Sequence, residues 1–402
     1  MRNPAENGWR DQAIFIMIPL MLTALFISRP ALAITLSIFL ALTILHRDIL
    51  AQLMNFISTP MLVALSLLFF IPFISGAWSD DLREWLGVMR VKLPFLLLPI
   101  AFAGRWQLTT RQWLLILYSF LILVALGCSW SLLQYAMDAR AIHENYLRAG
   151  IMPVPLDGDH VRFSWLVAIA MLACLLQFER TGRTVWLLPA FFFIIYLHVL
   201  SARTGLLMAY LAFLCFVIRK IASGKKSYYL WLTIPAALIL AGWLFVPTLK
   251  KRIQYIRYDL SLIVSDQYRS GTSDGNRLQS LKAGWYILRK KPFGTGAGDI
   301  RREVNAWYDK NAPGMQPHDR IYPSSEWMIH GNMAGWLGIA FFTVLVIFPL
   351  WISTRHRFFW LLLNSMAIAG LLFESSLEIQ YGVFIYCFVM LWWWKWLTFE
   401  NR

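Results

Sequence analysis

Long apolar runs recur from one end of this chain to the other, and they restrict its possible folds more than any other feature. A run of about twenty apolar residues crosses the hydrocarbon core of a bilayer as one helix. The chain is also 58% hydrophobic and only 15% charged, whereas soluble proteins average roughly 45–50% and about 25%. The sequence therefore predicts an all-α polytopic membrane protein.

The apolar runs and their interruptions predict about twelve transmembrane helices. The first follows a basic N-terminus, and its apolar run is longer than the core of a cleaved signal peptide. The helices are expected near residues 12–28, 31–46, 58–77, 86–104, 112–137, 161–178, 184–201, 204–219, 228–247, 331–352, 358–374 and 380–397. A large loop between the ninth and tenth divides the chain into a membrane domain (1–247), a loop domain (248–330) and a second membrane segment (331–402).

The connections between these helices form two sets that alternate along the chain. One set is short, basic and poor in acids, and includes Arg10, Arg47, Arg105, Arg111, Arg180, Arg183, Arg219, Lys220, Lys225, Lys226, Arg355, Arg357 and Lys395. The positive-inside bias places this set and both termini in the cytoplasm. The other set is expected to face the outside, which is the periplasm in a two-membrane bacterium: residues 79–92, 138–160, the turn at Arg203, 248–330 and 373–380.

The loop domain carries aromatic and apolar residues at helical spacing, so it is expected to fold rather than act as a linker. One predicted helix is capped by Asp274, ends at Pro292 and buries a face made of Leu278, Leu281, Trp285 and Leu288. A second is capped by Asp299 and turns Ile300, Val304 and Trp307 inward. The glycines of "GTGAGD" between them do not follow a strand, so they indicate a tight turn rather than a dinucleotide site.

The composition also limits the expected partners. A net charge of +15 would suit nucleic acid, but no soluble face interleaves basic and aromatic residues, so the lipid bilayer is the expected partner. The four cysteines lie inside apolar runs and are interpreted as buried thiols. No cluster has metal-ligand spacing, and we expect neither a metal nor a cofactor.

Two arginines stand where a cation is costly. Arg203 separates two apolar runs in "FFFIIYLHVLSARTGLLMAYLAFLCFVI", and ionisable residues in such segments usually serve a function. Arg277 falls in the first turn of the predicted loop helix, where the helix dipole disfavours a cation. A bound anion would remove that conflict, since a helix N-terminus with an Arg makes a strong anion site. The alternative for Arg277 is simple packing along the membrane surface.

Acidic residues near the C-terminus are candidates on the same side. Glu374 and Glu378 are spaced by one helical turn and are expected to share the outer edge of a helix. They could orient the arginines or bind a glycan, or pair with a nearby Arg for structure alone. His318 and His330 end the loop, and a lone His is more often structural than catalytic.

Six stretches together suggest a family: "LREWLGVMRVKLPFLLLPIAF", "DHVRFSWLVAIA", "LSARTGLL", "NRLQSLKAGWYILRKKPFGTGAG", "PSSEWMIHGNMAGWLG" and "FESSLEIQYGVFIYCF". In this order the chain resembles the bacterial O-antigen ligase and O-antigen polymerase superfamily, in the form typical of Bacteroidetes. The stretches span most of residues 80–390. Each motif is weak alone, and the six in the correct order are fairly specific.

The resemblance implies a glycosyltransferase of the inner membrane that moves a glycan from undecaprenyl diphosphate to an acceptor hydroxyl at the periplasmic face. The expected reaction is O-antigen ligation onto lipid A core in lipopolysaccharide biosynthesis. Negative charge develops on the leaving diphosphate, and fixed guanidinium groups would stabilise it without a metal. Arg203 and Arg277 are the expected catalytic arginines, and the substrate-binding candidates are Arg90, Lys92, His160, Arg162, Glu374 and Glu378.

The sequence departs from the family at the end of the loop. The family usually has Pro-His-Asn or a similar motif there, followed by Gly-x-x-Gly. Gly335 and Gly338 are present, but Ser324 occupies the position of the His. The general base is therefore open between His318, Ser324 and Glu326, or this lineage needs no strong base.

Other functions are compatible with parts of the pattern. A polymerase would join lipid-linked repeat units to a growing glycan with the same donor chemistry, and transfer to protein side chains is a related possibility. A lipid-linked oligosaccharide flippase is a different class, and it would place ionisable residues near the midplane and broken helices in repeated halves. The nearly uncharged spans and the polar groups on one face favour catalysis over transport.

Overall fold

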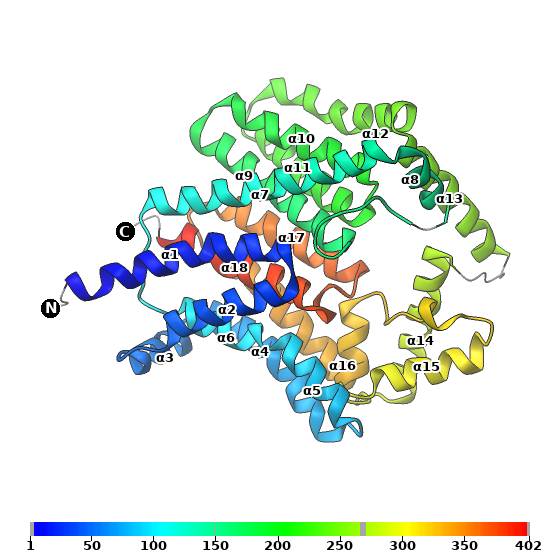
Figure 1. Cartoon of the computed structure of the whole chain (residues 1–402), viewed down its shortest axis with the longest axis horizontal. Coiled ribbons are helices and arrows are strands. Elements are labelled where there is room, and N and C mark those ends of the chain that lie inside the picture. The colour runs from blue at the N-terminus through cyan, green and yellow to red at the C-terminus, as the bar shows by residue number, and fades with distance from the viewer. Residues whose placement is uncertain (1–3, 149, 266–270, 400–402) are drawn as a thin grey trace.

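The computed structural model describes residues 4–148, 150–265 and 271–399, and within them it contains helices and connecting segments but no strand (Figure 1). The α-helices are α1 (Pro4–Ile27), α2 (Arg29–Ile44), α3 (Ile49–Ile57), α4 (Pro60–Ser75), α5 (Leu82–Lys92), α6 (Pro94–Phe102), α7 (Thr110–Met137), α8 (Ala139–Tyr146), α9 (His160–Thr181), α10 (Leu187–Leu200), α11 (Arg203–Ala222), α12 (Thr233–Phe245), α13 (Pro247–Val264), α14 (Ser273–Lys290), α15 (Ile300–Asn311), α16 (Glu326–Ile347), α17 (Arg357–Phe373) and α18 (Gln380–Phe399).

Eight helical segments of the described chain are long and apolar enough to cross a membrane, and a ninth is added if the sharply bent α2 and α3 form one span. The chain is thus a multi-pass membrane protein by helix length and hydropathy. Each of the twelve predicted segments falls on a helix. The lower count has physical causes, because α10 and α17 belong to shorter apolar segments. Helix α18 is not among the candidates either, and it is buried along nearly its whole length (Tyr381–Leu397), so it packs against protein rather than lipid.

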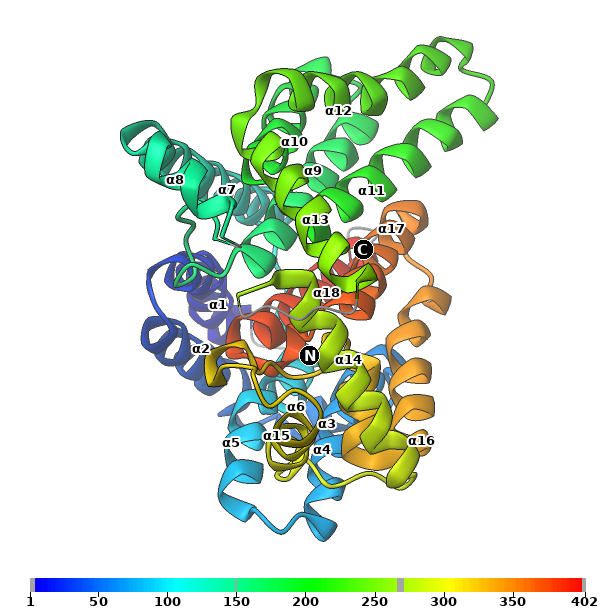
Figure 2. The same cartoon turned by 90° about the vertical axis from the view of Figure 1, so that its right-hand side faces the viewer.

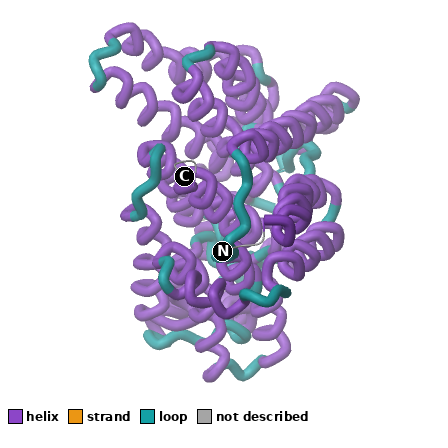
Figure 3. The backbone as a smooth tube through the Cα atoms, turned by 90° about the vertical axis from the view of Figure 1, so that its left-hand side faces the viewer, coloured by secondary structure: helices purple, strands orange, loops and turns teal. Residues whose placement is uncertain are grey.

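The two alternating sets of connections gather at opposite ends of the bundle. Both ends of the described chain lie together (Figure 3), whereas α13, α14 and α15 come to the front when the molecule is viewed from the other side (Figure 2). At the end with the termini, the buried Lys395 ammonium donates to the carbonyl oxygens of Phe102 (2.9 Å) and Gly104 (2.8 Å). We call the other end, which carries α5, α8 and α13–α15, the loop end.

The predicted loop domain contains α13, α14 and α15, so its two expected helices are present. Asp299 is the N-cap residue of α15 as predicted, but neither its side chain nor that of Asp274 caps a helix. Asp274 lies inside α14, and its backbone N–H and that of Gly275 donate instead to the carboxylate of Asp259 on α13 (2.6 and 3.1 Å). The Asp299 carboxylate accepts from the backbone of Asp80 at 2.7 Å rather than from α15. Both acidic groups therefore join segments that are distant in sequence, and the anion site expected at the start of α14 is filled by Asp259.

The predicted buried face of α14 is also wrong in part. Leu288 is buried, but Trp285 is 40% exposed. The buried face is instead lined mainly by smaller residues, among them Ser280, Ala283 and Gly284. A Cβ on Gly284 would lie 3.0 Å from the ring of Pro323, so the small residues allow α14 to approach the chain just before α16. In contrast, Ile300, Val304 and Trp307 of α15 are buried as predicted.

The glycine-rich turn after α14 is seated in a break of α16. Ala334 and Gly335 have non-helical dihedral angles within α16, and Gly335 has a φ of +68°. Three backbone hydrogen bonds cross between turn and break: Thr295 N–H to Asn332 O (2.7 Å), Gly296 N–H to Met333 O (3.0 Å) and Trp336 N–H to Pro292 O (3.0 Å). The predicted tight turn is present, and it also fastens the loop domain to the membrane helices.

Gly335→Ala is expected to prevent the glycine-rich turn from packing into the break of α16. An alanine Cβ would overlap the carbonyl oxygen of Pro292, and the positive φ alone costs a non-glycine residue about 1–3 kcal/mol. The expected result is a strong loss of folded protein, measured by yield and thermal unfolding in detergent. Gly87→Ala on α5 is the matched control, because its Cβ would meet no atom within 4 Å. Equal stability of both variants would contradict the described packing.

Candidate functional site

Arg203 is placed at the loop end by a sharp turn between two helices. Ser201 has a left-handed conformation (φ 53°) and ends α10, and α11 begins two residues later. The guanidinium of Arg203 forms a two-pronged ion pair with Asp274 of α14, with N–O distances of 2.8 and 2.6 Å. A guanidinium has five N–H donors, so this pair leaves three of them for other acceptors. Arg203 is thus a partly exposed cation at the end of the bundle.

Arg277 is linked to the neighbour of Arg203 through the carboxylate of Glu374. It donates to Oε1 of Glu374, which is buried at the end of α17, and Thr204 donates to the same oxygen at 3.1 Å. Thr204 is the neighbour of Arg203 in α11, and Asp274 is one turn before Arg277 in α14. Helices α11, α14 and α17 therefore bring the two predicted catalytic arginines to one place.

Two further arginines complete the group. The Arg252 guanidinium lies 5.5 Å from the centre of the Tyr255 ring, and the Tyr255 hydroxyl accepts the N–H of Ser273, the neighbour of Asp274. Arg162 follows His160, the partly exposed first residue of α9, by two positions. Arg162 also donates to the carbonyl oxygens of Ser375 (2.6 Å) and Ser376 (3.3 Å) and pairs with Asp159 at 3.3 Å. We call Arg162, Arg203, Arg252 and Arg277 the arginine cluster.

The cluster governs the ionisation of the acid within it. Burial raises the pKa of the Asp274 carboxyl, but the hydrogen bond and charge of Arg203, with Arg277 and Arg252, outweigh burial and hold this pKa below its ordinary value. The Asp274 carboxylate is therefore stabilised in its charged form. Its contribution to stability is present above the ordinary carboxyl pKa and is lost as the pH falls through the lowered value.

Two buried polar side chains, Lys92 and Glu326, hold the segment from Glu374 to Glu378. The buried Lys92 ammonium donates to Leu377 O (2.7 Å) and to the Glu378 carboxylate (2.6 Å). Glu326, which is fully buried, accepts the Leu377 N–H at 2.5 Å. The predicted shared helix edge for Glu374 and Glu378 is wrong, because Glu374 follows the end of α17 and Glu378 lies in a short 3₁₀ turn. The sequence spacing suggested one helix, whereas the chain is extended at Glu374 and then forms the 3₁₀ turn.

The remaining predicted residues lie outside direct contact with these ion pairs. The His318 side chain is 76% exposed and approaches Asp319 at 3.9 Å. Ser324 is buried and its hydroxyl is 3.1 Å from that of Ser280, one turn after Arg277. Arg90 is exposed on α5, and His330 is buried with Nδ1 2.8 Å from Glu326 O. Of the three base candidates, only His318 presents an exposed side chain.

Sequence reasoning missed Arg252, Thr204 and the pairing role of Asp274. Arg252 lies in "TLKKRIQYIRYDL", a stretch rich in Lys and Arg, so nothing singled it out. The signal is burial, since Arg252 is 7% exposed and the others in that stretch are more accessible. Burial of one basic residue among several depends on the packing of α13 and cannot be read from spacing.

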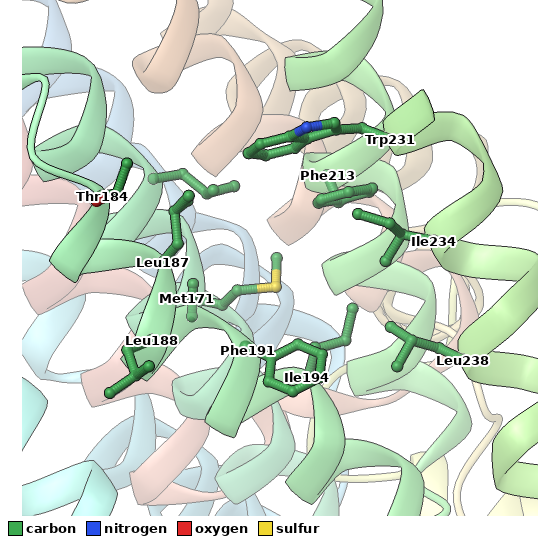
Figure 4. A pocket seen from close by; sticks show the side chains of 12 residues that line it. Met171, Thr184, Leu187, Leu188, Phe191, Ile194, Phe213, Trp231, Ile234 and Leu238 are labelled. Carbon is green, nitrogen blue, oxygen red and sulfur yellow. The ribbon is translucent and has the colours of Figure 1, made fainter. Parts of the chain in front are cut away.

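Two apolar hollows lie apart from the arginine cluster. One, of about 310 Å³, is lined by α9, α10, α11 and α12, and Figure 4 shows Met171, Phe213 and Trp231 around it. The other, of about 630 Å³, lies between α4 and α16 beside the break at Ala334. Neither is lined by a candidate site residue, so neither bears on the chemistry of the cluster.

Four guanidinium groups lie together at one end of a membrane bundle, an arrangement with the chemistry to bind a phosphate-like anion. Guanidinium matches carboxylate and phosphate oxygens in paired hydrogen bonds and keeps its charge at any physiological pH. A search against protein-family models finds none that matches the chain. No curated protein matches it either. The function is therefore argued from the arrangement of residues.

Proposed function

We propose that the chain is a glycosyltransferase that takes a glycan from an undecaprenyl-diphosphate carrier and passes it to an acceptor hydroxyl. The observation that carries the proposal is the arginine cluster, in which Arg203 and Arg277 meet through Thr204, Glu374 and Asp274. Two predicted anion-binding residues from segments 74 positions apart (277 − 203) thus lie in one group. The resemblance of the six sequence stretches to the O-antigen ligase and polymerase superfamily supports the same reaction.

The position of the cluster suits a lipid-linked donor. Arg203 begins a candidate membrane span and Arg277 belongs to the loop domain, so the group lies where spans meet the loop end. A headgroup at that level would leave its polyprenyl tail in the bilayer. The positive-inside bias assigns the loop end to the periplasmic side of the inner membrane.

The chemistry follows from the charge of the leaving group. An acceptor hydroxyl attacks the anomeric carbon of the donor sugar, the bond from that carbon to the phosphate oxygen breaks, and the polyprenyl diphosphate leaves with its electron pair. Arg203 and Arg277 stabilise the charge that grows on that oxygen. A direct displacement of this kind would invert the anomeric centre, as the family resemblance also implies.

The hydroxyl proton is taken by a general base within hydrogen-bond reach, and His318 is our candidate because its ring is exposed. Ser324 and Glu326 are buried and hold neighbouring segments. With purified lipid-linked donor, His318→Ala is expected to slow transfer by about 10²-fold or more, and Ser324→Ala is expected to retain most of the rate. Glu326→Gln is expected to act mainly on stability. Near-full rates for all three variants would reject every candidate base.

We propose lipid A core as the acceptor, which makes the reaction O-antigen ligation. The test is the lipopolysaccharide profile of a deletion strain, with the wild-type gene restored as the control. Loss of all long chains from the core is expected. Core carrying a single repeat would instead identify a polymerase, and unchanged chains with undiminished transfer by membranes would refute both.

A further inference from the structure

Arg252 is a buried cation whose polar atoms are not all satisfied. It lies on α13 and is 7% exposed, and its guanidinium carbon is 5.5 Å from the centre of the Tyr255 ring. Within the described residues, Nε and Nη1 of Arg252 have no hydrogen-bond acceptor. Buried guanidinium groups are normally paired because removing their charge from water is costly. An unpaired one therefore indicates a missing partner.

The acids of the region already serve the other arginines. Asp159 pairs with Arg162, Asp274 with Arg203 and Glu374 with Arg277. Asp259, one further acid nearby, accepts the first backbone N–H groups of α14. In the part of the chain that the structure describes, three of the four cluster arginines thus have a carboxylate, and no ion pair joins one to Arg252.

The tyrosine hydroxyl groups near Arg252 also form hydrogen bonds with other partners. Tyr255 accepts the Ser273 N–H at 2.6 Å and donates to Gly271 O at 3.3 Å. The Tyr146 hydroxyl donates to Leu200 O at 2.8 Å and accepts the Met152 N–H. Burial and the positive charge of Arg203 lower the pKa of the Arg252 guanidinium from its ordinary value, which fits a cation without a partner.

We propose that Arg252 is a substrate-binding residue whose missing partner is an oxygen of the donor diphosphate. The inference rests on the proposed function and adds to it a residue that the sequence did not indicate. Arg252 lies over the Tyr255 ring, and the Tyr255 hydroxyl accepts the N–H of Ser273, which precedes Asp274 in α14. Asp274 in turn pairs with Arg203, so the Arg252 guanidinium belongs to the same group of contacts. An anion bound there would pair with Arg252, the one arginine of the cluster that forms no ion pair with a carboxylate of the described chain.

The test compares the ligand-free stability of the full chain in detergent with its affinity for two probes, undecaprenyl diphosphate and inorganic pyrophosphate. Arg252→Met removes an unpaired buried charge, so its melting temperature without ligand is expected to equal or exceed that of the wild type. Its Kd for undecaprenyl diphosphate is expected to rise at least tenfold. Arg252→Lys keeps the positive charge but loses the paired N–H donors of the guanidinium, and an intermediate Kd is expected. Arg257→Met, on an exposed position of the same helix, is the control and leaves both quantities unchanged.

The outcomes separate the inference from the proposed function. If the wild type binds the lipid and Arg252→Met binds it within twofold, or if that variant unfolds more readily or does not fold, Arg252 is structural and the inference fails while the function stands. If the wild type binds neither probe, the proposed function fails with it. Equal affinity of the wild type for inorganic pyrophosphate would overturn the assignment of the anion to a lipid headgroup.

Discussion

Arg203→Ala and Arg277→Ala are each expected to lower glycan transfer by about 10²- to 10³-fold, the usual cost of removing one donor that stabilises charge in a transition state. Each variant loses a guanidinium that faces the proposed leaving diphosphate, and each leaves a carboxylate, Asp274 or Glu374, without its ion pair. Both ion pairs are partly exposed, so the variants are expected to insert and accumulate. The measurement is transfer from purified donor together with the amount of protein in the membrane.

Lysine variants and a control sharpen this prediction. Arg203→Lys and Arg277→Lys retain the charge but cannot form paired hydrogen bonds, so they are expected to recover only part of the rate. Arg289→Ala on α14 is the matched control, since Arg289 is exposed and its guanidinium lies over the Trp285 ring. Full activity of Arg203→Ala or Arg277→Ala, or an equal loss with Arg289→Ala, would refute the assignment.

Lys92→Met is expected to cause the largest loss of stability outside the glycine turn, about 3–5 kcal/mol, because it removes one partner of a buried ion pair. The Lys92 side chain is 2% exposed and that of Glu378 is 13% exposed. The substitution leaves the Glu378 carboxylate unpaired and Leu377 O without its donor. Thermal or denaturant unfolding of the purified protein in detergent measures the effect.

A double variant identifies the cause. Lys92→Met with Glu378→Gln removes the unpaired negative charge, so it is expected to recover part of the stability that Lys92→Met loses. If the double variant is less stable than Lys92→Met alone by the full cost of Glu378→Gln, the two residues are not coupled. The buried pair would then have no special role in holding the turn before α18.

The helical framework could be predicted because apolar run length depends on the bilayer and not on tertiary contacts. The number of spans could not, since α10 and α17 are short. The surroundings of α18 could not either, because it is buried in protein along nearly its whole length. Hydrophobic runs report that a segment is buried, but they do not distinguish burial in lipid from burial in the bundle.

The candidate site was predictable where a charge stood against its local background. Arg203 between apolar runs is of that kind. Arg277 was expected in a first helical turn, but α14 begins at Ser273, so Arg277 lies in the second turn. The structure still links the two arginines, through Thr204 and Glu374. Arg252 does not stand out in this way, because its neighbours in sequence are basic too. Asp274 and Asp299 have the sequence context of caps. However, Asp274 accepts a hydrogen bond from Arg203, and Asp299 accepts one from the backbone N–H of Asp80, so both partners are more than 70 positions away. Such long-range partners depend on packing and leave no local pattern.

The most direct test of the arginine cluster as a donor site is a structure of the full chain bound to undecaprenyl diphosphate. We expect the diphosphate oxygens to lie within hydrogen-bond distance of the guanidinium groups of Arg203 and Arg277 at the loop end. A headgroup bound at the opposite end of the bundle, or one that touches neither arginine, would contradict the account.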